Sequence, residues 1–252
     1  MWDSPRLLNA VANALFALAI ALVVYGGGRA LVESRAFPLR TVRVLGDLQQ
    51  VGRPDVVHAL QGKVEGTFFT ADLDAISALF RAIPWVRRAD IRRQWPDLLE
   101  VTLEEHVALA RWGQGKDASL VNTHGELFTG RSDATLPLFS GPAGTEGEIA
   151  RRYQAFRSLL APLELQPQRV ALSARFAWQL RLSNGLAVRL GRESEKDSLE
   201  DRLARFVAAY PQALGKLGRD LDYVDLRYPN GFALRVPDSS RPDFGKAQRK
   251  RV

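Results

Sequence analysis

The 252-residue chain is 46% hydrophobic and 25% charged, a composition that can fold around a core and is not that of a disordered protein. Its 35 Lys and Arg residues against 28 Asp and Glu give a formal net charge of +7, but the cations are spread along the sequence, which argues against nucleic-acid binding. Cysteine is absent and the three histidines are His58, His106 and His124, which excludes disulfides and thiolate zinc sites and leaves little for a catalytic triad.

An uncharged segment near the N-terminus, residues 7–28, predicts a transmembrane helix. Its 22 residues would extend about 33 Å as a helix, enough to cross a hydrocarbon core of about 30 Å. Tyr25 lies where an interfacial aromatic residue belongs, and the glycines at 26–28 predict a flexible exit. A cleaved signal peptide is the alternative, but its apolar region is shorter, about 7–15 residues, and its start is more basic than the single Arg6. We therefore expect a retained anchor.

The charges that flank this segment conflict with export of the large C-terminal part. Arg6 precedes the segment, whereas Arg29, Arg35, Arg40 and Arg43 follow it. The positive-inside rule alone would place the C-terminal part in the cytoplasm. Large domains are nevertheless exported largely regardless of flanking charge, so the charge pattern leaves the orientation open.

Residues 39–107 predict a small α+β domain with the order strand, helix, helix, strand, strand. Thr70 is the expected N-cap of the second helix, and Pro84 ends it. The last two strands alternate apolar and polar residues with a period of two. The expected strands are 41–44, 88–92 and 99–104, the expected helices are 54–61 and 71–83, and residues 95–97 form the turn between the last two strands.

Residues 108–236 predict an antiparallel β meander with two packed helices, and residues 237–252 a disordered basic tail. The Asn-Gly pair at 184–185 is a strong hairpin signal, and Pro229-Asn230-Gly231 predicts the last turn. The expected strands are 108–112, 127–128, 136–139, 176–182, 188–190, 224–228 and 232–236, and the expected helices are 149–160 and 199–210.

Three sets of residues contain groups that occur in chemical sites, and none predicts catalysis. In Glu104-Glu105-His106 the neighbouring side chains of a strand point to opposite faces, which favours a solvated strand end. Asp220, Asp222 and Asp225 lack the glycine and the completing glutamate of a calcium loop.

The third set consists of two turns that contain glycine, Gly141-Pro142-Ala143-Gly144 and Leu190-Gly191-Arg192. We expect neither turn to follow a strand and open a helix as a phosphate-binding loop does. We therefore expect no enzyme activity, no metal and no cofactor, and a molecule that works by binding.

Six strings of residues, taken together and in order, resemble the FtsQ/DivIB family of cell-division proteins. The similarity runs from the apolar segment to about residue 236. The strings are Ile83-Pro84-Trp85-Val86, Arg92-Arg93-Gln94-Trp95-Pro96-Asp97-Leu98-Leu99 with Glu105 leading to Ala110-Arg111-Trp112, Arg175-Phe176-Ala177-Trp178, Leu190-Gly191-Arg192, Arg202-Leu203-Ala204-Arg205-Phe206 and Val224-Asp225-Leu226-Arg227-Tyr228.

The resemblance implies a single-pass inner-membrane protein of the division septum. Residues 1–6 would be cytoplasmic, and a periplasmic POTRA domain and a β domain would follow the span. It further implies a non-enzymatic role in the divisome, in which the protein binds FtsB and FtsL and links early to late septum-building components. The orientation expected for the family is the one that the flanking charges alone oppose.

The resemblance also implies a partner-binding site for FtsB, at Arg175, Tyr223, Arg227, Tyr228 and Phe232. A last strand that precedes a disordered tail is expected at a sheet edge, where a partner strand can be added by β-augmentation. Tyr223 and Tyr228 are five residues apart and would point to opposite faces of a regular strand.

Two other functions remain as alternatives. A membrane-anchored POTRA protein that handles outer-membrane or secreted polypeptides would carry repeated POTRA units, and the sequence predicts one. A periplasmic cell-wall hydrolase would need a carboxylate pair in a cleft or a metal site.

Overall fold

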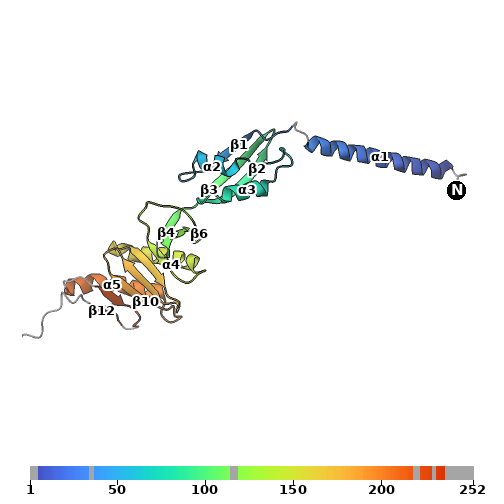
Figure 1. Cartoon of the computed structure of the whole chain (residues 1–252). Helices are drawn as coiled ribbons and strands as arrows, with labels where there is room; N and C mark the ends of the chain where they lie inside the picture. Colours follow the sequence, from blue (N-terminus) through green and yellow to red (C-terminus); the bar gives the residue numbers. More distant parts are fainter. Residues whose placement is uncertain (1–4, 34–36, 114–118, 218–221, 229–230, 236–252) are drawn as a thin grey trace, which may run out of the picture. The chain divides into compact units, whose positions relative to one another are not determined.

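The computed structural model describes residues 5–33, 37–113, 119–217, 222–228 and 231–235 (Figure 1). The chain forms two compact units, Met1–Glu105 and His106–Val252. The predicted basic tail at 237–252 and the turn residues 229–230 lie outside the described residues.

The first unit begins with a single long helix, α1 (Pro5–Glu33), whose apolar stretch Asn9–Ala30 is long enough to cross a membrane. All side chains from residue 9 to residue 30 are exposed, so the rest of the described chain does not cover this apolar surface. The flexible exit predicted at residues 26–28 is wrong, because α1 continues through the glycines to Glu33. A helix satisfies every backbone group internally, as an apolar medium requires.

The remainder of the first unit is a three-stranded sheet with two helices, in the predicted order. In the sheet order β1-β3-β2, β3 is the central strand. β1 pairs with it in parallel and β2 pairs with it antiparallel. Phe80, Leu99 and Val101 are fully buried at the centre of the core. The elements are β1 (Thr41–Leu45), α2 (Arg53–Leu60), α3 (Leu73–Arg81), β2 (Val86–Gln94) and β3 (Leu98–Glu105).

The N-cap of α3 is Asp72 and not the predicted Thr70. One carboxylate oxygen of Asp72 accepts hydrogen bonds from the backbone N–H groups of Asp74 and Ala75, at 2.9 and 3.0 Å. Thr70 instead accepts a hydrogen bond from the backbone N–H of Thr67, at 2.8 Å. The cap is therefore supplied by the carboxylate of Asp72, which is two residues nearer to the helix than Thr70.

The second unit contains a nine-stranded sheet of order β12-β11-β10-β9-β8-β7-β4-β5-β6. The sequence predicted neither β5 nor β8. The strands are β4 (Ala108–Trp112), β5 (Ser119–Asn122), β6 (Leu127–Phe128), β7 (Leu138–Ser140), β8 (Pro167–Leu172), β9 (Trp178–Leu182), β10 (Ala187–Gly191), β11 (Tyr223–Asp225) and β12 (Ala233–Arg235), with the helices α4 (Glu146–Leu160), η1 (Ala161–Leu163, 3₁₀) and α5 (Leu199–Leu217).

The sheet is mixed, so the predicted antiparallel meander is wrong in three strand pairs. β4 and β7, β7 and β8, and β10 and β11 are parallel. The chain reaches β8 from β7 through α4 and reaches β11 from β10 through α5. A helical crossover is what returns a chain parallel to its previous strand.

The two helices cover the core of the second unit. α4 packs against β8, α5 packs against β10, and the helices also contact each other. Phe139, Phe156 and Phe206 are almost fully buried between helices and sheet.

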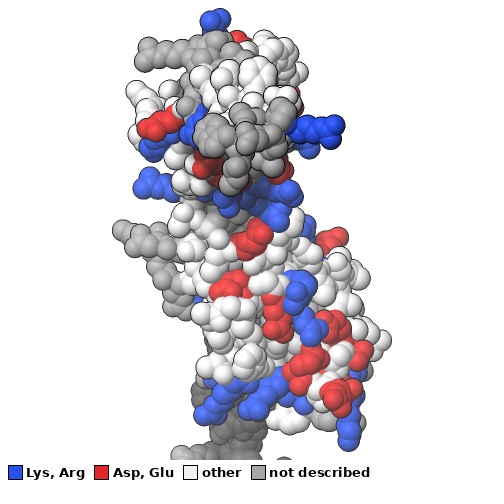
Figure 2. All heavy atoms as spheres, turned by 90° about the vertical axis from the view of Figure 1, so that its right-hand side faces the viewer, with Lys and Arg blue, Asp and Glu red and all other residues white. Residues whose placement is uncertain are grey.

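Over the face drawn in Figure 2, Lys and Arg side chains lie among Asp and Glu side chains.

Candidate partner-binding site

β12 forms one edge of the large sheet and pairs with β11 only. Its three residues are antiparallel to β11, with Val224 opposite Leu234. No strand among the described residues pairs with the outer edge of β12. An edge strand of this kind carries backbone groups that can pair with a further strand.

Asp225, on the neighbouring strand β11, is the centre of a polar cluster. The Tyr223 hydroxyl donates to Asp225 Oδ2 at 2.8 Å. The Arg227 guanidinium donates from Nε to Oδ1 at 2.8 Å and from Nη2 to Oδ2 at 2.6 Å, and the Arg227 backbone N–H also donates to Oδ1. Asp225 is only 3% exposed, and these hydrogen bonds supply its carboxylate with the partners that water cannot provide.

These contacts shift the ionisation of both acidic groups. The hydrogen bonds from Arg227 lower the pKa of Asp225 from 3.8 to about 2, against the opposing effect of burial. Burial, followed by the hydrogen bond to Asp225, raises the pKa of Tyr223. At neutral pH the cluster therefore holds an ionised carboxylate, a protonated phenol and a guanidinium.

Gly191, at the end of β10, has no side chain, and this allows the side chain of Arg227 to pack directly against its backbone. A Cβ atom at position 191 would lie 2.8 Å from Arg227 Cγ and 3.1 Å from Cδ. Gly191 also has a φ of +83°, which other residues adopt with strain. The glycine therefore determines where the stem of Arg227 lies.

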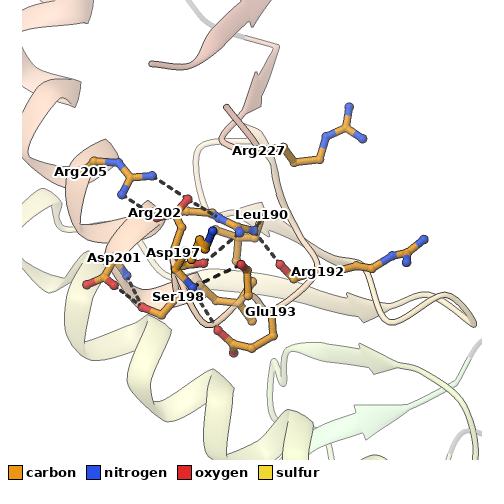
Figure 3. A network of polar contacts seen from close by, with 12 residues as sticks. Leu190, Arg192, Glu193, Asp197, Ser198, Asp201, Arg202, Arg205 and Arg227 are labelled. Atoms are coloured by element: carbon orange, nitrogen blue, oxygen red, sulfur yellow. Dashed lines mark hydrogen bonds and ion pairs between the residues drawn. The ribbon is translucent and has the colours of Figure 1, made fainter. Parts of the chain in front are cut away.

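A second arginine fixes the same end of β10 from the side of α5 (Figure 3). Arg202 Nη1 donates to the backbone oxygens of Leu190 and Arg192, both at 2.7 Å, and Nε donates to Asp197 Oδ2 at 2.8 Å. Arg205 also pairs with Asp197, at 2.7 Å. Hydrogen bonds from Arg205 and then Arg202 lower the pKa of Asp197 to about 2. The network joins two of the strings that carry the family resemblance.

The face of β8–β12 away from the helices carries exposed arginines. The strand register places Arg169 opposite Arg181, and Arg235 opposite Tyr223. The guanidinium carbon of Arg189 lies 4.6 Å from the centre of the Tyr223 ring. Asp225 is the one acidic residue within these five described strands. This face would therefore attract an acidic partner.

The predicted site residues gather at one end of the sheet, except Tyr223. Arg175 lies in the turn between β8 and β9, and Trp178 at the start of β9 pairs with Gly191. Because Arg227 also packs at Gly191, Arg175 and Arg227 belong to the same end of the sheet. Tyr223 pairs with Ala187 at the opposite end of β10.

The two remaining predicted residues differ in exposure. Tyr228 is 54% exposed. Phe232 is half-buried, with its ring centre 6.4 Å from that of Phe206 on α5. Because β11 ends at Asp225, the opposite-face argument for Tyr223 and Tyr228 does not apply.

The Glu104-Glu105-His106 set divides among three separate partners. Glu104 pairs with Arg87 at 2.7 Å, and His106 contacts Asn122 at 2.9 Å. The Glu105 carboxylate accepts the backbone N–H groups of residues 49–51, the shortest at 2.6 Å. The predicted solvated strand end is thus wrong for Glu105, because a carboxylate here satisfies the free donors that precede α2.

The two glycine turns do follow strands and lead into helices, contrary to the prediction. Residues 141–145 join β7 to α4, and residues 192–198 join β10 to α5. Acidic side chains occupy their free donors: Glu146 accepts from the Gly144 N–H at 3.0 Å, and Glu193 accepts from the Leu199 N–H at 3.2 Å. A bound phosphate would meet negative charge at both turns.

The three aspartates that lack the features of a calcium loop do not form a metal site among the described residues. Asp220 lies outside the described residues, Asp222 is exposed, and Asp225 is paired with Arg227. No group of three or more potential metal ligands occurs within the described part of the chain.

Sequence reasoning missed Asp225, Gly191 and Arg202 as members of the site. A usable signal was present for Asp225, because Tyr223, Asp225 and Arg227 are spaced two residues apart, which is the spacing of side chains on one face of an extended segment. Gly191 and Arg202 gave no such signal, since their partners are distant in sequence.

Two family models cover most of the chain. Residues 37–106 match the FtsQ-type POTRA domain, and residues 110–227 match the C-terminal region of cell division protein FtsQ/DivIB. The chain is 45% identical over 239 residues to cell division protein FtsQ of Burkholderia pseudomallei, with 94% of each chain covered. It is 40% identical over 240 residues to that of Nitrosospira multiformis, with 93% of this chain and 99% of the relative covered. These matches confirm the resemblance seen in the residue strings.

Proposed function

The chain belongs to the FtsQ/DivIB family of cell division proteins, and we propose that it serves division as a non-enzymatic scaffold that binds FtsB and FtsL. In this role it links early to late components of septum assembly. The observation that carries the proposal is that no strand among the described residues pairs with the outer edge of β12, in the sheet whose neighbouring segment exposes Arg227 and Tyr228.

A partner segment of FtsB would add to the sheet as a strand next to β12. Backbone hydrogen bonds to an edge strand supply affinity, and side chains at the rim supply specificity. Tyr and Arg are favoured anchors because each combines apolar area with directed hydrogen bonds. Tyr228 and Arg227 would be such anchors, and Arg175 would extend the contact at the same end of the sheet.

The other predicted site residues would act mainly through position. Tyr223 donates its hydroxyl to Asp225 and carries Arg189 on its ring, so it supports the arginine face. Phe232 packs against Phe206 and holds the start of β12 on the core. The exposed arginines of β8–β12 favour a partner segment with acidic side chains.

We further propose that the protein is anchored in the inner membrane at the septum, with both units in the periplasm. The apolar helix α1 fits a single-pass membrane protein of this family. In this reading residues 1–6 are cytoplasmic, residues 39–107 form the POTRA domain and residues 108–236 the β domain. A fluorescent fusion tests the location: a band at midcell supports the proposal, and a uniform envelope signal contradicts it.

Strand addition is tested with FtsB peptides methylated at single backbone amides. Only every second amide of an added strand faces β12, so methylation at alternate positions should weaken binding to the full-length protein in detergent, by about tenfold per lost hydrogen bond. Methylation at the intervening positions is the matched control and should have little effect. Equal effects at all positions, or none at any, would rule out strand addition.

A further inference from the structure

The first unit carries a cluster of four aromatic side chains, Phe37, Phe68, Phe69 and Trp95, here called the aromatic cluster. The ring centres of Phe37 and Phe69 are 5.2 Å apart, and those of Phe37 and Trp95 are 5.8 Å apart. Phe68 is buried, whereas Trp95 is 64% and Phe69 is 43% exposed. Two large aromatic rings are thus presented together to the surroundings, as at an interaction surface.

The strand register places this cluster where the chain enters from α1. β1 is parallel to β3, so the start of β1 lies beside the turn that carries Trp95. The backbone N–H groups of Arg40 and Thr41 both donate to the Asp97 oxygen in that turn. The Phe68 N–H donates to the Phe37 oxygen at 2.8 Å, which adds the loop of Phe69 to the same end.

The apolar stretch of α1 ends close to the aromatic cluster. The stretch ends at Ala30, and Val32 lies about 3 Å further along the helix axis. The Thr67 hydroxyl donates to the Val32 oxygen at 3.0 Å. A headgroup layer extends about 6 Å beyond the hydrocarbon core on each side. The cluster therefore reaches the layer in which aromatic rings preferentially reside.

The exposed rings are held in place before any contact is made. Arg93 donates from Nε to the Phe68 oxygen at 2.7 Å and from Nη2 to the Ala71 oxygen at 2.6 Å. These bonds fix the loop that carries Phe69. Because a pre-ordered surface loses little conformational freedom on binding, the contact needs no rearrangement of the loop.

We propose that the aromatic cluster docks on the membrane surface at the end of the span, with Trp95 and Phe69 inserted among the lipid headgroups. The occupant is a lipid surface because α1 delivers the cluster to that layer. This inference rests on the proposed membrane anchoring of α1. The docked cluster gives the first unit a second attachment to the bilayer, beside the span itself.

The test uses the full-length protein in vesicles of phosphatidylcholine and phosphatidylglycerol, with and without bromine near the headgroup end of the acyl chains. Bromine quenches tryptophans that lie close to it. The Trp95 signal is the fluorescence of the wild type minus that of Trp95→Phe. We expect brominated lipid to remove about half or more of this signal, as for an interfacial residue. Trp112→Phe, which removes a half-buried tryptophan of the second unit, is the matched control, and its difference signal should remain unquenched.

A separate measurement distinguishes failure of this inference from failure of the anchoring. Extraction at alkaline pH releases the whole chain if α1 does not span the bilayer, and both proposals then fail. If the chain resists extraction but the Trp95 signal is not quenched, the anchoring stands and the docking is overturned. Circular dichroism of Trp95→Phe verifies that the variant is folded. Quenching of the Trp95 difference signal with acrylamide, which enters from water, should fall on vesicle insertion.

Discussion

Arg227 and Asp225 form an ion pair in which the cation is exposed and the anion is buried. The Arg227 side chain is 54% exposed, whereas the Asp225 side chain is 5% exposed, and Nη2 lies 2.6 Å from Oδ2. The carboxylate thus fixes the orientation of a guanidinium that faces the surroundings. An arginine held in this way can meet a partner without first losing side-chain freedom.

Replacing Asp225 by Asn should therefore weaken partner binding in addition to its effect on the fold. Asn preserves the shape but removes the charge that orients Arg227. We expect FtsB peptide to bind about tenfold more weakly by calorimetry, the loss typical of a charge-assisted hydrogen bond. Asp222→Asn, a substitution at an exposed position on the same segment, is the control and should bind normally. Equal losses in both variants would show that net charge, and not orientation, is responsible.

Tyr228→Ala should remove an anchor of the proposed interface. Since Tyr228 is 54% exposed, its loss should leave the unfolding transition of the protein in place. Binding of FtsB peptide should weaken by about 2 kcal/mol or more, as for an interface hot spot. Leu127→Ala changes a 45% exposed residue on β6, the opposite edge of the same sheet, and should bind as the wild type does. Unchanged affinity of Tyr228→Ala would remove this residue from the site.

Gly191→Ala should disturb the fold and the proposed interface together. The added methyl group would overlap the stem of Arg227 at 2.8 Å, and the φ of +83° strains any residue with a Cβ atom. We expect a loss of about 1–3 kcal/mol in the free energy of unfolding, measured with urea. Gly185→Ala is matched in backbone angle, with a φ of +85°, but its methyl group would meet no atom within 4 Å. A larger loss of peptide binding in Gly191→Ala than in Gly185→Ala would show the effect of displacing Arg227.

The protein should lose stability as the pH falls from about 4 to about 2. The pKa values of Asp197 and Asp225 are both lowered from 3.8 to about 2, so between these values the unfolded chain binds more protons than the folded chain. The stabilisation is complete above pH 4 and disappears as the pH falls through the folded-state value. Asp225 should account for on the order of 2 kcal/mol, and the more exposed Asp197 for less because solvent screens its ion pairs, which urea unfolding at pH 5 and at pH 2.5 would measure.

The double variant Asp197→Asn, Asp225→Asn provides the control for this acid sensitivity. It should be less stable at pH 5 and should lose much less of its remaining stability on acidification. If its dependence on pH matched that of the wild type, other carboxylates would be responsible.

Local patterns in the sequence were sufficient for the apolar helix and for the order of elements in the first unit. An uncharged apolar segment of this length predicts a long helix, and alternation in β2 and β3 predicts strands joined by a short turn. In such neighbouring elements the contacts that stabilise the fold lie close in sequence. The N-cap of α3 was misplaced by two residues, because both Thr70 and Asp72 are suitable caps and only their geometry separates them.

Strand pairing and the grouping of the site residues were decided by the tertiary structure. Helical crossovers through α4 and α5 make two strand pairs parallel, and β4 and β7, which are joined through β5 and β6, form the third. A period-of-two pattern is the same in either direction. Gly191, Arg202 and Arg227 meet only because β10 lies between α5 and β11. The sequence by itself thus determined which segments are apolar or alternating, since these properties belong to neighbouring residues. Which charges become buried and paired depends on contacts between distant residues, and only the folded chain brings these together.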